Sequence, residues 1–168
     1  MESLTIELRE EQSQAILGLP YLSLELGGDV TAAVQLRFVR ETLVLDSDRF
    51  TQMPNVHPCL LGLVEHRSNV FWVLDLPQLL GFTALDSTAI ETHIAVLQIG
   101  GSFLGLGLER IGRVLRFGEA EIVSSDSLIN IPSEIEPFLR GGVLQSEAIG
   151  NHLYVLDAEA IASHNFSI

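Results

Sequence analysis

The 168-residue sequence predicts a mainly β protein built from antiparallel barrels, and three observations support this fold class. Apolar and polar residues alternate with a period of two in several short segments, which is the pattern of half-buried strands. No predicted strand alternates with a long helix, as a parallel α/β fold would require. Gly62-Leu63-Val64 and Val73-Leu74-Asp75 are echoed by Gly142-Val143-Leu144 and Val155-Leu156-Asp157. The echo predicts a duplicated β unit, with a chance match of a common tripeptide as the alternative.

The first half of the chain predicts five strands separated by turn residues. Tight hairpin turns are expected at residues 27–29 and 66–69, the first because glycine and aspartate tolerate positive φ. Residues 53–58 hold two prolines and predict an extended loop, since proline cannot donate to a strand ladder. Pro77 then opens a short helix that Gly81 ends. The predicted strands cover residues 21–26, 30–38, 42–45, 60–65 and 70–74.

The second half repeats this pattern. The longest uncharged stretch, residues 92–108, is close to the shortest membrane span, but its four glycines favour a hairpin of two buried strands. Ser133 and Glu136 have the spacing of a capping box and predict a short helical turn. Residues 157–162 are rich in helix formers and predict a terminal helix. The predicted strands cover residues 93–99, 103–108, 110–117, 143–145 and 153–156.

Composition and charge exclude several classes of protein. A hydrophobic fraction of 47% and a charged fraction of 18% contradict a disordered chain, and the length suits one domain or two intimate subdomains. Twenty-two acidic residues face nine basic ones, all arginine, and the net charge is -13. Nucleic acids and anionic membranes are therefore not expected as partners, because both bind clusters of basic residues.

The termini and the single cysteine indicate a cytoplasmic protein. Cys59 has no partner for an intramolecular disulfide, and acidic residues interrupt the N-terminal segment where a secretory signal would stand. Residues 1–19 mix charged and apolar residues and predict an N-terminal arm of uncertain order, either a short helix or a loosely held segment.

Motifs that carry catalysis are missing from the sequence. Cys59 lies in an apolar setting without an activating cation, and the five histidines lack the spacing of metal ligands. Gly105-Leu106-Gly107 lacks the third glycine of a dinucleotide fingerprint, and Asp46 and Asp48 lack the glycine and closing glutamate of a calcium loop. We therefore expect no enzyme activity, no cofactor and no metal site. Acidic β proteins of this kind commonly bind other proteins.

Several segments together resemble the CheW family of chemotaxis coupling proteins. The order and spacing of the segments carry the resemblance, which spans about residues 21–161. In the first half they are residues 39–41 (VRE, against V-x-E), the Met53-Pro54 loop, residues 62–67 (GLVEHR, against G-V-x-N-L-R-G) and residues 73–81 (VLDLPQLLG, against V-I-D-L-x-x-L-L-G). In the second half they are residues 105–114 (GLGLERIGRV, against V-G-x-x-V-D-x-V-x-x-V), residues 138–142 (FLRGG, against F-x-x-G-V) and residues 155–157 (VLD, against L-D-L).

This resemblance implies two small five-stranded antiparallel β-barrels side by side over residues 20–164, outside the arm of residues 1–19. It also implies a noncatalytic cytoplasmic adaptor that is recruited to membrane receptor arrays. Such a protein couples a methyl-accepting chemoreceptor-type protein to the regulatory domain of a CheA-type histidine kinase, in chemotaxis, phototaxis or pilus-based motility. The family's receptor-facing surface would fall on Val39, Gly62 and Arg67, and Glu41 would lie near the kinase-facing part.

Each of these four residues also has a purely structural interpretation. The Arg67 guanidinium either caps backbone carbonyls of its own turn or binds a partner carboxylate. Val39 suits a core strand, Glu41 suits a solvated strand face, and Gly62 suits a strand glycine that permits close approach.

The hairpin tip departs from the family pattern, because Glu65-His66-Arg67-Ser68 stands where the family has N-L-R-G. This departure leaves open a regulator or decoy that binds only one of the two partners. A third hypothesis is a β-barrel that binds a small ligand inside. Small barrels are usually filled by their own side chains, so this hypothesis requires an interior cavity on the order of several hundred Å³.

Overall fold

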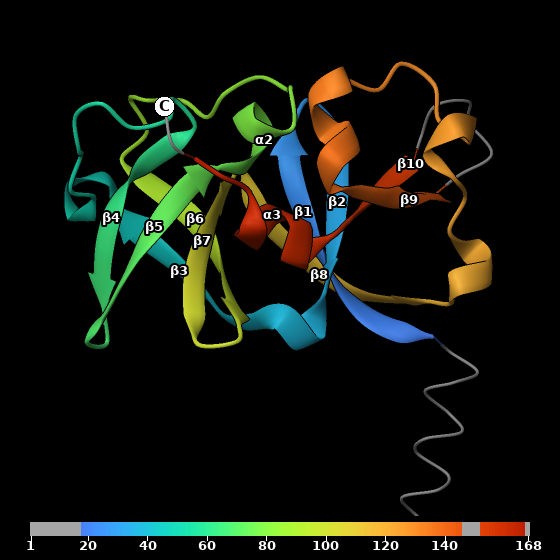
Figure 1. Ribbon diagram of the computed structural model, residues 1–168, viewed down its shortest axis with the longest axis horizontal. Coiled ribbons are helices and arrows are strands. Elements are labelled where there is room, and N and C mark those ends of the chain that lie inside the picture. The colour runs from blue at the N-terminus through green and yellow to red at the C-terminus, as the bar shows by residue number, and fades with distance from the viewer. Residues whose placement is uncertain (1–17, 146–151, 167–168) are drawn as a thin grey trace, which may run out of the picture.

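The computed structural model describes residues 18–145 and 152–166, which form two five-stranded sheets lying side by side (Figure 1). The prediction of two five-stranded β subdomains is confirmed. The strands are β1 (Leu19–Gly27), β2 (Val30–Gln35), β3 (Val39–Asp46), β4 (Leu60–His66), β5 (Asn69–Asp75), β6 (Glu91–Ile99), β7 (Ser102–Leu108), β8 (Arg110–Phe117), β9 (Leu139–Leu144) and β10 (His152–Leu156). The short helices are η1 (Leu36–Phe38), η2 (Ser47–Arg49), α2 (Leu76–Leu79), η3 (Glu119–Glu121), η4 (Ser125–Ser127), η5 (Ser133–Phe138) and α3 (Ala158–Ser163).

The first subdomain, on the left in Figure 1, is continuous in sequence from β3 to β7. Its strand order is β3-β6-β7-β5-β4. All neighbours pair antiparallel except β5 and β7, which run parallel. The expected antiparallel sheet therefore contains one parallel pair, because the crossover through α2 and residues 80–90 brings the β6–β7 hairpin to the far side of β5.

The second subdomain combines the two ends of the described chain. Its strand order is β8-β1-β2-β10-β9, so the hairpin β1–β2 inserts between strands of the C-terminal half. Here β10 and β2 are the parallel pair. Position by position, this order matches that of the first subdomain, with β1–β2 taking the place of β6–β7. The second subdomain is therefore a circularly permuted copy of the first.

The internal echo seen in the sequence is real, but its glycines align one residue away from the prediction. Gly62 and Gly141 both have φ +151°. Each precedes a residue that forms an isolated antiparallel bridge, Leu63 to Thr51 and Gly142 to Val123. The counterpart of Gly62 is therefore Gly141 and not Gly142. The sequence echo misaligned them because Gly141 and Gly142 are adjacent and the pattern does not distinguish two neighbouring glycines.

Aspartates begin both α-helices. An Oδ1 atom of Asp75 accepts the Gln78 N–H at 3.0 Å, and Asp157 accepts the Ala160 N–H at 3.0 Å. These contacts satisfy N–H groups that the first helical turn leaves unpaired. Gly81, with φ +86°, follows α2 as predicted. Both predicted helices are confirmed.

The predicted capping box at Ser133 and Glu136 is wrong, although the predicted helical turn forms. Helix η5 begins at Ser133, and its N-cap residue is Pro132, with no side-chain cap hydrogen bond. Proline has no polar side chain, so the helix N-terminus lacks the acceptor that a capping box requires.

Residues 92–108 form the hairpin of β6 and β7, turning at Gly100, which has φ +62°. Within the described part of the chain, no helix has the length and apolar character needed to cross a membrane. Strand β1 begins at Leu19, and residues 1–17 of the predicted arm lie outside the described residues.

Buried side chains pack inside each barrel and between the two. The largest cluster lies between the subdomains and includes residues of α2 and α3. In the second barrel, Tyr21 stacks on Phe117 with ring centroids 4.0 Å apart. The interior of the first barrel holds Leu45, Val64, Phe71, Val73, Ile94 and Val96. The interior of the second holds Tyr21, Ala33, Phe117, Leu153 and Val155.

Candidate functional site

The tip of the β4–β5 hairpin presents Arg67 to solvent. The strands reach His66 and Asn69, so Arg67 and Ser68 alone make the turn, with φ of +50° and +66°. Two successive positive φ values are the geometry of a type I′ hairpin turn, which asparagine and glycine usually supply. The predicted tight turn is confirmed, and the Arg67 side chain is 74% exposed at its tip.

Arg67 contacts a carboxylate and is not the clamp of its own turn. Its Nη1 atom lies 3.3 Å from Oε2 of Glu41, on β3. The turn is held instead by Asn69, whose Nδ2 donates to the Arg67 carbonyl at 3.3 Å. The structure therefore brings together two of the four residues that the resemblance singled out, from segments far apart in the sequence.

Glu41 also faces His66, which sequence reasoning did not include. The His66 Nε2 atom lies 3.5 Å from Glu41 Oε1, and both side chains are 20% exposed. His66 Nε2 is buried and makes no hydrogen bond to the described residues. Side chains alternate along a strand, so His66 shares its face with Val64, inside the barrel. That period-two pattern was the available signal that His66 points inward at this end of the barrel.

Gly62 and Val39, unlike Arg67 at the exposed tip, are buried or half-buried within the strands. Gly62 is buried, and a Cβ added to it would lie 2.8 Å from the Thr51 carbonyl oxygen. Its observed role is to let β4 approach Thr51. Val39 is half-buried, pairs with Leu97 and packs against the central core. A register shift between Val39 and Glu41 separates the two along β3.

A polar cleft of about 440 Å³ lies beside the tip, between the β4–β5 hairpin and η2. Arg49 crosses it, donating from Nη2 to the Glu65 carbonyl at 3.1 Å. Its lining residues are Asp48, Arg49, Thr51, Glu65, His66, Arg67 and Ser68. Both signs of charge line this cleft, which is therefore suited to charged and hydrogen-bonding groups.

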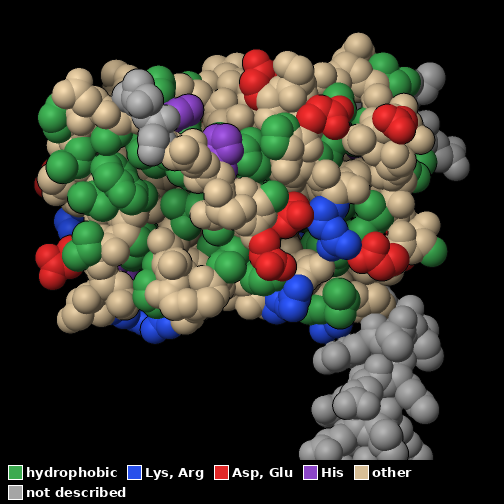
Figure 2. Space-filling model, in the orientation of Figure 1, with side chains coloured by type: hydrophobic (Ala, Val, Ile, Leu, Met, Phe, Trp, Pro, Cys, Tyr) green, Lys and Arg blue, Asp and Glu red, His purple; other side chains and the backbone are tan. Residues whose placement is uncertain are grey.

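A larger groove of about 570 Å³ runs over the outside of the first barrel. It is lined by β5, β6 and β7 and, at one end, by Phe166, which packs edge-on against His57 and His164. Figure 2 shows hydrophobic side chains gathered on the left of this face, where β4, β5 and β7 lie in Figure 1. The groove is on the outer face, and buried side chains pack the barrel interior. It therefore differs from the interior cavity that a ligand-binding barrel requires.

Comparison with known proteins extends these observations. No curated protein matches the sequence. In structure, the chain is similar to the scaffolding protein TtCheW from Thermoanaerobacter tengcongensis, with a TM-score of 0.70 and 16% sequence identity over 89% of this chain and 96% of that one. The model of the CheW-like domain family matches residues 20–166, nearly the whole of the two-barrel structure. The chain therefore belongs to the family of CheW-like domain proteins.

Proposed function

We propose that this protein is a noncatalytic adaptor that couples a chemoreceptor-type protein to a CheA-type histidine kinase, in chemotaxis, phototaxis or pilus-based motility. The observation that carries the proposal is the CheW-like domain over residues 20–166. The similar solved structure is described as a scaffolding protein, and a scaffold acts by presenting surfaces to its partners. Under this proposal the protein works in the cytoplasm and is recruited to membrane receptor arrays.

The proposal assigns receptor binding to Val39, Gly62 and Arg67, and kinase binding to Glu41. Arg67 supports it most directly, because its guanidinium is 74% exposed and has donors to spare beyond its contact with Glu41. Gly62 would act indirectly, by letting β4 close against Thr51 and so fixing the position of the tip. Glu41 connects the two assignments, since its carboxylate faces Arg67 from β3.

A second candidate function is that of a regulator or decoy that binds only one of the two partners. The observation that favours it is that the Glu41 carboxylate already contacts His66 and Arg67 of its own chain. A kinase that needs this carboxylate would have to displace these contacts.

A three-component sedimentation experiment tests the proposal. Membranes bearing a chemoreceptor of the source organism are mixed with its CheA-type kinase, with and without the purified protein. An adaptor makes the kinase sediment with the receptor membranes, whereas a decoy is retained by one partner and leaves the kinase in solution. Binding to neither partner would contradict both functions.

The Arg67→Glu variant tests the assigned site. We expect it to abolish receptor binding with little change in melting temperature, because the side chain is mostly exposed. Arg110→Glu is a matched control, since the Arg110 side chain is 70% exposed and pairs with Glu25 at 2.7 Å in the second subdomain. Receptor binding by Arg67→Glu equal to that of the unaltered protein would remove Arg67 from the site.

A further inference from the structure

Two exposed arginines, Arg37 and Arg40, lie three positions apart in the chain, and no carboxylate of the described residues lies within 4 Å of either. The whole chain has more than two acidic residues for each arginine. Arg67, Arg110 and Arg140 each have a carboxylate within 4 Å. Among the described residues, five arginines have none and are all exposed: Arg37, Arg40, Arg49, Arg113 and Arg116. Of these five, Arg37 and Arg40 are the two whose guanidinium groups lie over aromatic rings, and they place positive charge on both sides of Val39 in the chain.

Neutral neighbours hold both guanidinium groups in place. Arg37 Nε donates to the Gln35 side chain at 2.6 Å, and its guanidinium lies 4.3 Å from the centre of the Phe38 ring. Arg40 Nη1 donates to the Gln98 side chain at 3.0 Å, and its guanidinium lies 5.0 Å from the centre of the Phe103 ring. An amide and an aromatic ring orient a guanidinium without cancelling its charge. Each group therefore keeps most of its five N–H donors for another acceptor.

The two arginines flank Val39, the proposed receptor contact. Arg37 belongs to η1 and Arg40 to the start of β3, while Phe103 lies just after the β6–β7 turn. In Figure 1, η1 and the tips of the β4–β5 and β6–β7 hairpins lie along the same lower border of the molecule. Arginine side chains gather along that border in Figure 2, whereas acidic side chains are spread over the upper border, the left edge and the middle of the same face.

The acidic groups nearest to this edge leave it open. Asp157 and Glu159 share a small hollow of about 220 Å³ with Arg37, but neither comes within 4 Å of its nitrogens. Glu41 points to the other side, toward His66 and Arg67.

From this arrangement we infer that Arg37, Phe38, Val39, Arg40 and Phe103 form a docking edge for an acidic segment of the partner protein. The segment would place apolar side chains against Val39 and the two rings, and carboxylates against the two guanidinium groups. Guanidinium and carboxylate form paired, charge-assisted hydrogen bonds, and such contacts fix the orientation of a partner. Because the protein as a whole is negative, the two positive charges at this edge attract an acidic partner that much of the remaining surface repels. The inference rests on the proposed function and names the chemistry of the receptor surface.

Binding of a purified chemoreceptor signalling domain of the source organism, measured at low and high salt, tests the inference. For the double variant Arg37→Gln/Arg40→Gln we expect the dissociation constant at low salt to rise about tenfold, with a weaker salt dependence than that of the unaltered protein. Arg37→Lys/Arg40→Lys keeps the charge and should keep the salt dependence while losing part of the affinity. Arg110→Gln, which removes an exposed arginine elsewhere, should bind as the unaltered protein does.

The outcomes separate this inference from the proposed function. If the glutamine double variant binds with unchanged affinity and unchanged salt dependence, the docking edge is wrong while the adaptor function stands. If the unaltered protein binds no receptor at any salt concentration, both fall. Circular dichroism and thermal melting of each variant establish that a loss of binding does not come from unfolding.

Discussion

Each barrel has a seam where one edge strand, β4 or β9, pairs with the segment that follows the other edge strand, β3 or β8, and the two seams can be compared directly. In the first, Thr51 and Leu63 exchange backbone hydrogen bonds of 2.8 and 2.9 Å. In the second, Val123 and Gly142 do so at 2.8 and 3.0 Å. In both, the preceding glycine has φ +151° and allows the two backbones to approach. The backbone arrangement that closes the barrel is thus the same in the two halves.

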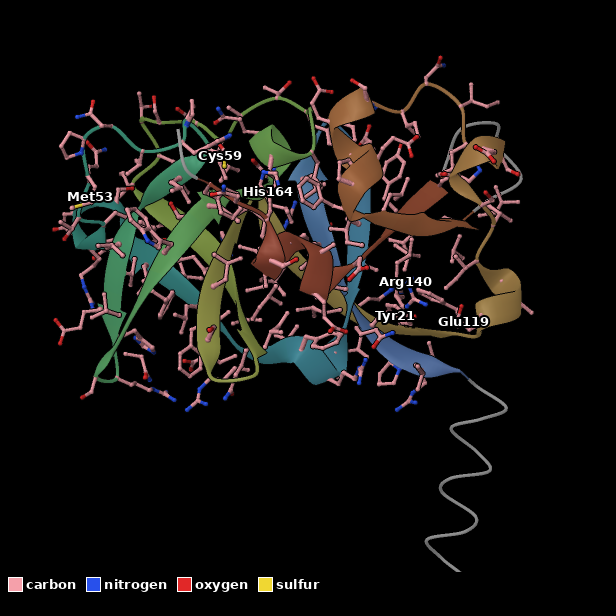
Figure 3. The ribbon with its side chains drawn as sticks, in the orientation of Figure 1. Tyr21, Met53, Cys59, Glu119, Arg140 and His164 are labelled. Carbon is pink, nitrogen blue, oxygen red and sulfur yellow. The ribbon has the colours of Figure 1, made fainter. Side chains whose placement is uncertain are left out.

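The side chains that reinforce the seams differ. In the second barrel, Arg140 Nη2 meets Glu119 Oε1 at 2.9 Å, with the arginine side chain 32% exposed (Figure 3). In the first, the arginine sits at the hairpin tip, 74% exposed, and Glu41 contacts His66 as well. Backbone closure is needed to complete any barrel of this kind, so both halves retain it. The side-chain bridge is not needed in one fixed place, and in the first barrel it puts a cation where a partner can reach it.

Substituting the seam glycines should give the largest effect. A Cβ on Gly62 would lie 2.8 Å from the Thr51 oxygen, and one on Gly141 would lie closer still to the Val123 oxygen. With the strain of a side chain at this φ, we expect Gly62→Ala and Gly141→Ala to cost roughly 2–5 kcal/mol each, Gly141→Ala more. Urea unfolding measures the loss. Gly101→Ala is the control, because its Cβ would meet nothing within 4 Å. Equal stability of all three variants would contradict the shared backbone arrangement.

Substituting the helix-capping aspartates should give the next largest loss of stability, and the loss should differ between the two halves. Asp75 is 2% exposed and accepts from the N–H groups of Gln78 and Leu85, whereas Asp157 is half-buried and caps α3 through Ala160. We expect Asp75→Ala to lower the free energy of unfolding by about 2–3 kcal/mol, because it leaves two N–H groups without an acceptor. Asp157→Ala should lower it by about 1 kcal/mol. Thermal unfolding measures both. Asparagine at each position keeps an acceptor and should recover part of the loss, and a larger cost at Asp157 would reverse the ranking.

Cys59 offers a probe of opening on the side of the central core that the first subdomain supplies. Cys59 and Phe138 hold equivalent positions, since their carbonyls accept the N–H groups of Asp75 and Asp157 at 2.6 and 2.8 Å. Burial, with the nearby Asp75 charge, raises the pKa of the Cys59 thiol to about 11. At mildly alkaline pH, iodoacetamide should react about a hundredfold or more slowly with the folded protein than with the unfolded one, and faster as pH rises.

The same probe sharpens the comparison of the seams. Gly62→Ala weakens the closure of the first barrel and should accelerate alkylation of Cys59 more than a second-seam substitution of equal global cost. Alkylation of the native protein as fast as the unfolded chain would show that the thiol is not buried.

Removing the seam ion pairs should have the smallest effect on stability. Glu41→Gln and Glu119→Gln each remove one carboxylate charge, and we expect losses below about 1 kcal/mol, since one side chain of each pair is at least 70% exposed. Urea unfolding with Arg67→Gln and Arg140→Gln completes a double-mutant cycle at each seam. A coupling free energy well above this value at the first seam would make the Glu41 contacts structural and weaken the proposed receptor role of Arg67.

Local sequence patterns predicted most of the fold, because strands, turns and caps depend on near neighbours. Alternation located the strands, and Gly27-Gly28-Asp29 and Gly100-Gly101 gave the turns. Two local signals failed: alternation extended the second strand over residues 36–38, which form η1, and the capping box at Ser133 does not form. For the site, the resemblance singled out Arg67 and Glu41, and the hairpin pattern placed Arg67 at a tip. His66 was missed as their neighbour, since no local pattern pairs β3 with a hairpin tip far along the chain.

By itself, the sequence determined an acidic β protein of duplicated units, with an arginine at one hairpin tip and short helices near Pro77 and at residues 157–162. Only the tertiary structure decided that β1–β2 completes the second barrel, that each sheet contains one parallel pair, and that Gly141 matches Gly62. It also decided that Arg37 and Arg40 stay free of carboxylates. The physical reason is that pairings between distant segments are selected by burial of shared surface and by backbone closure, and these forces act only once the chain is compact.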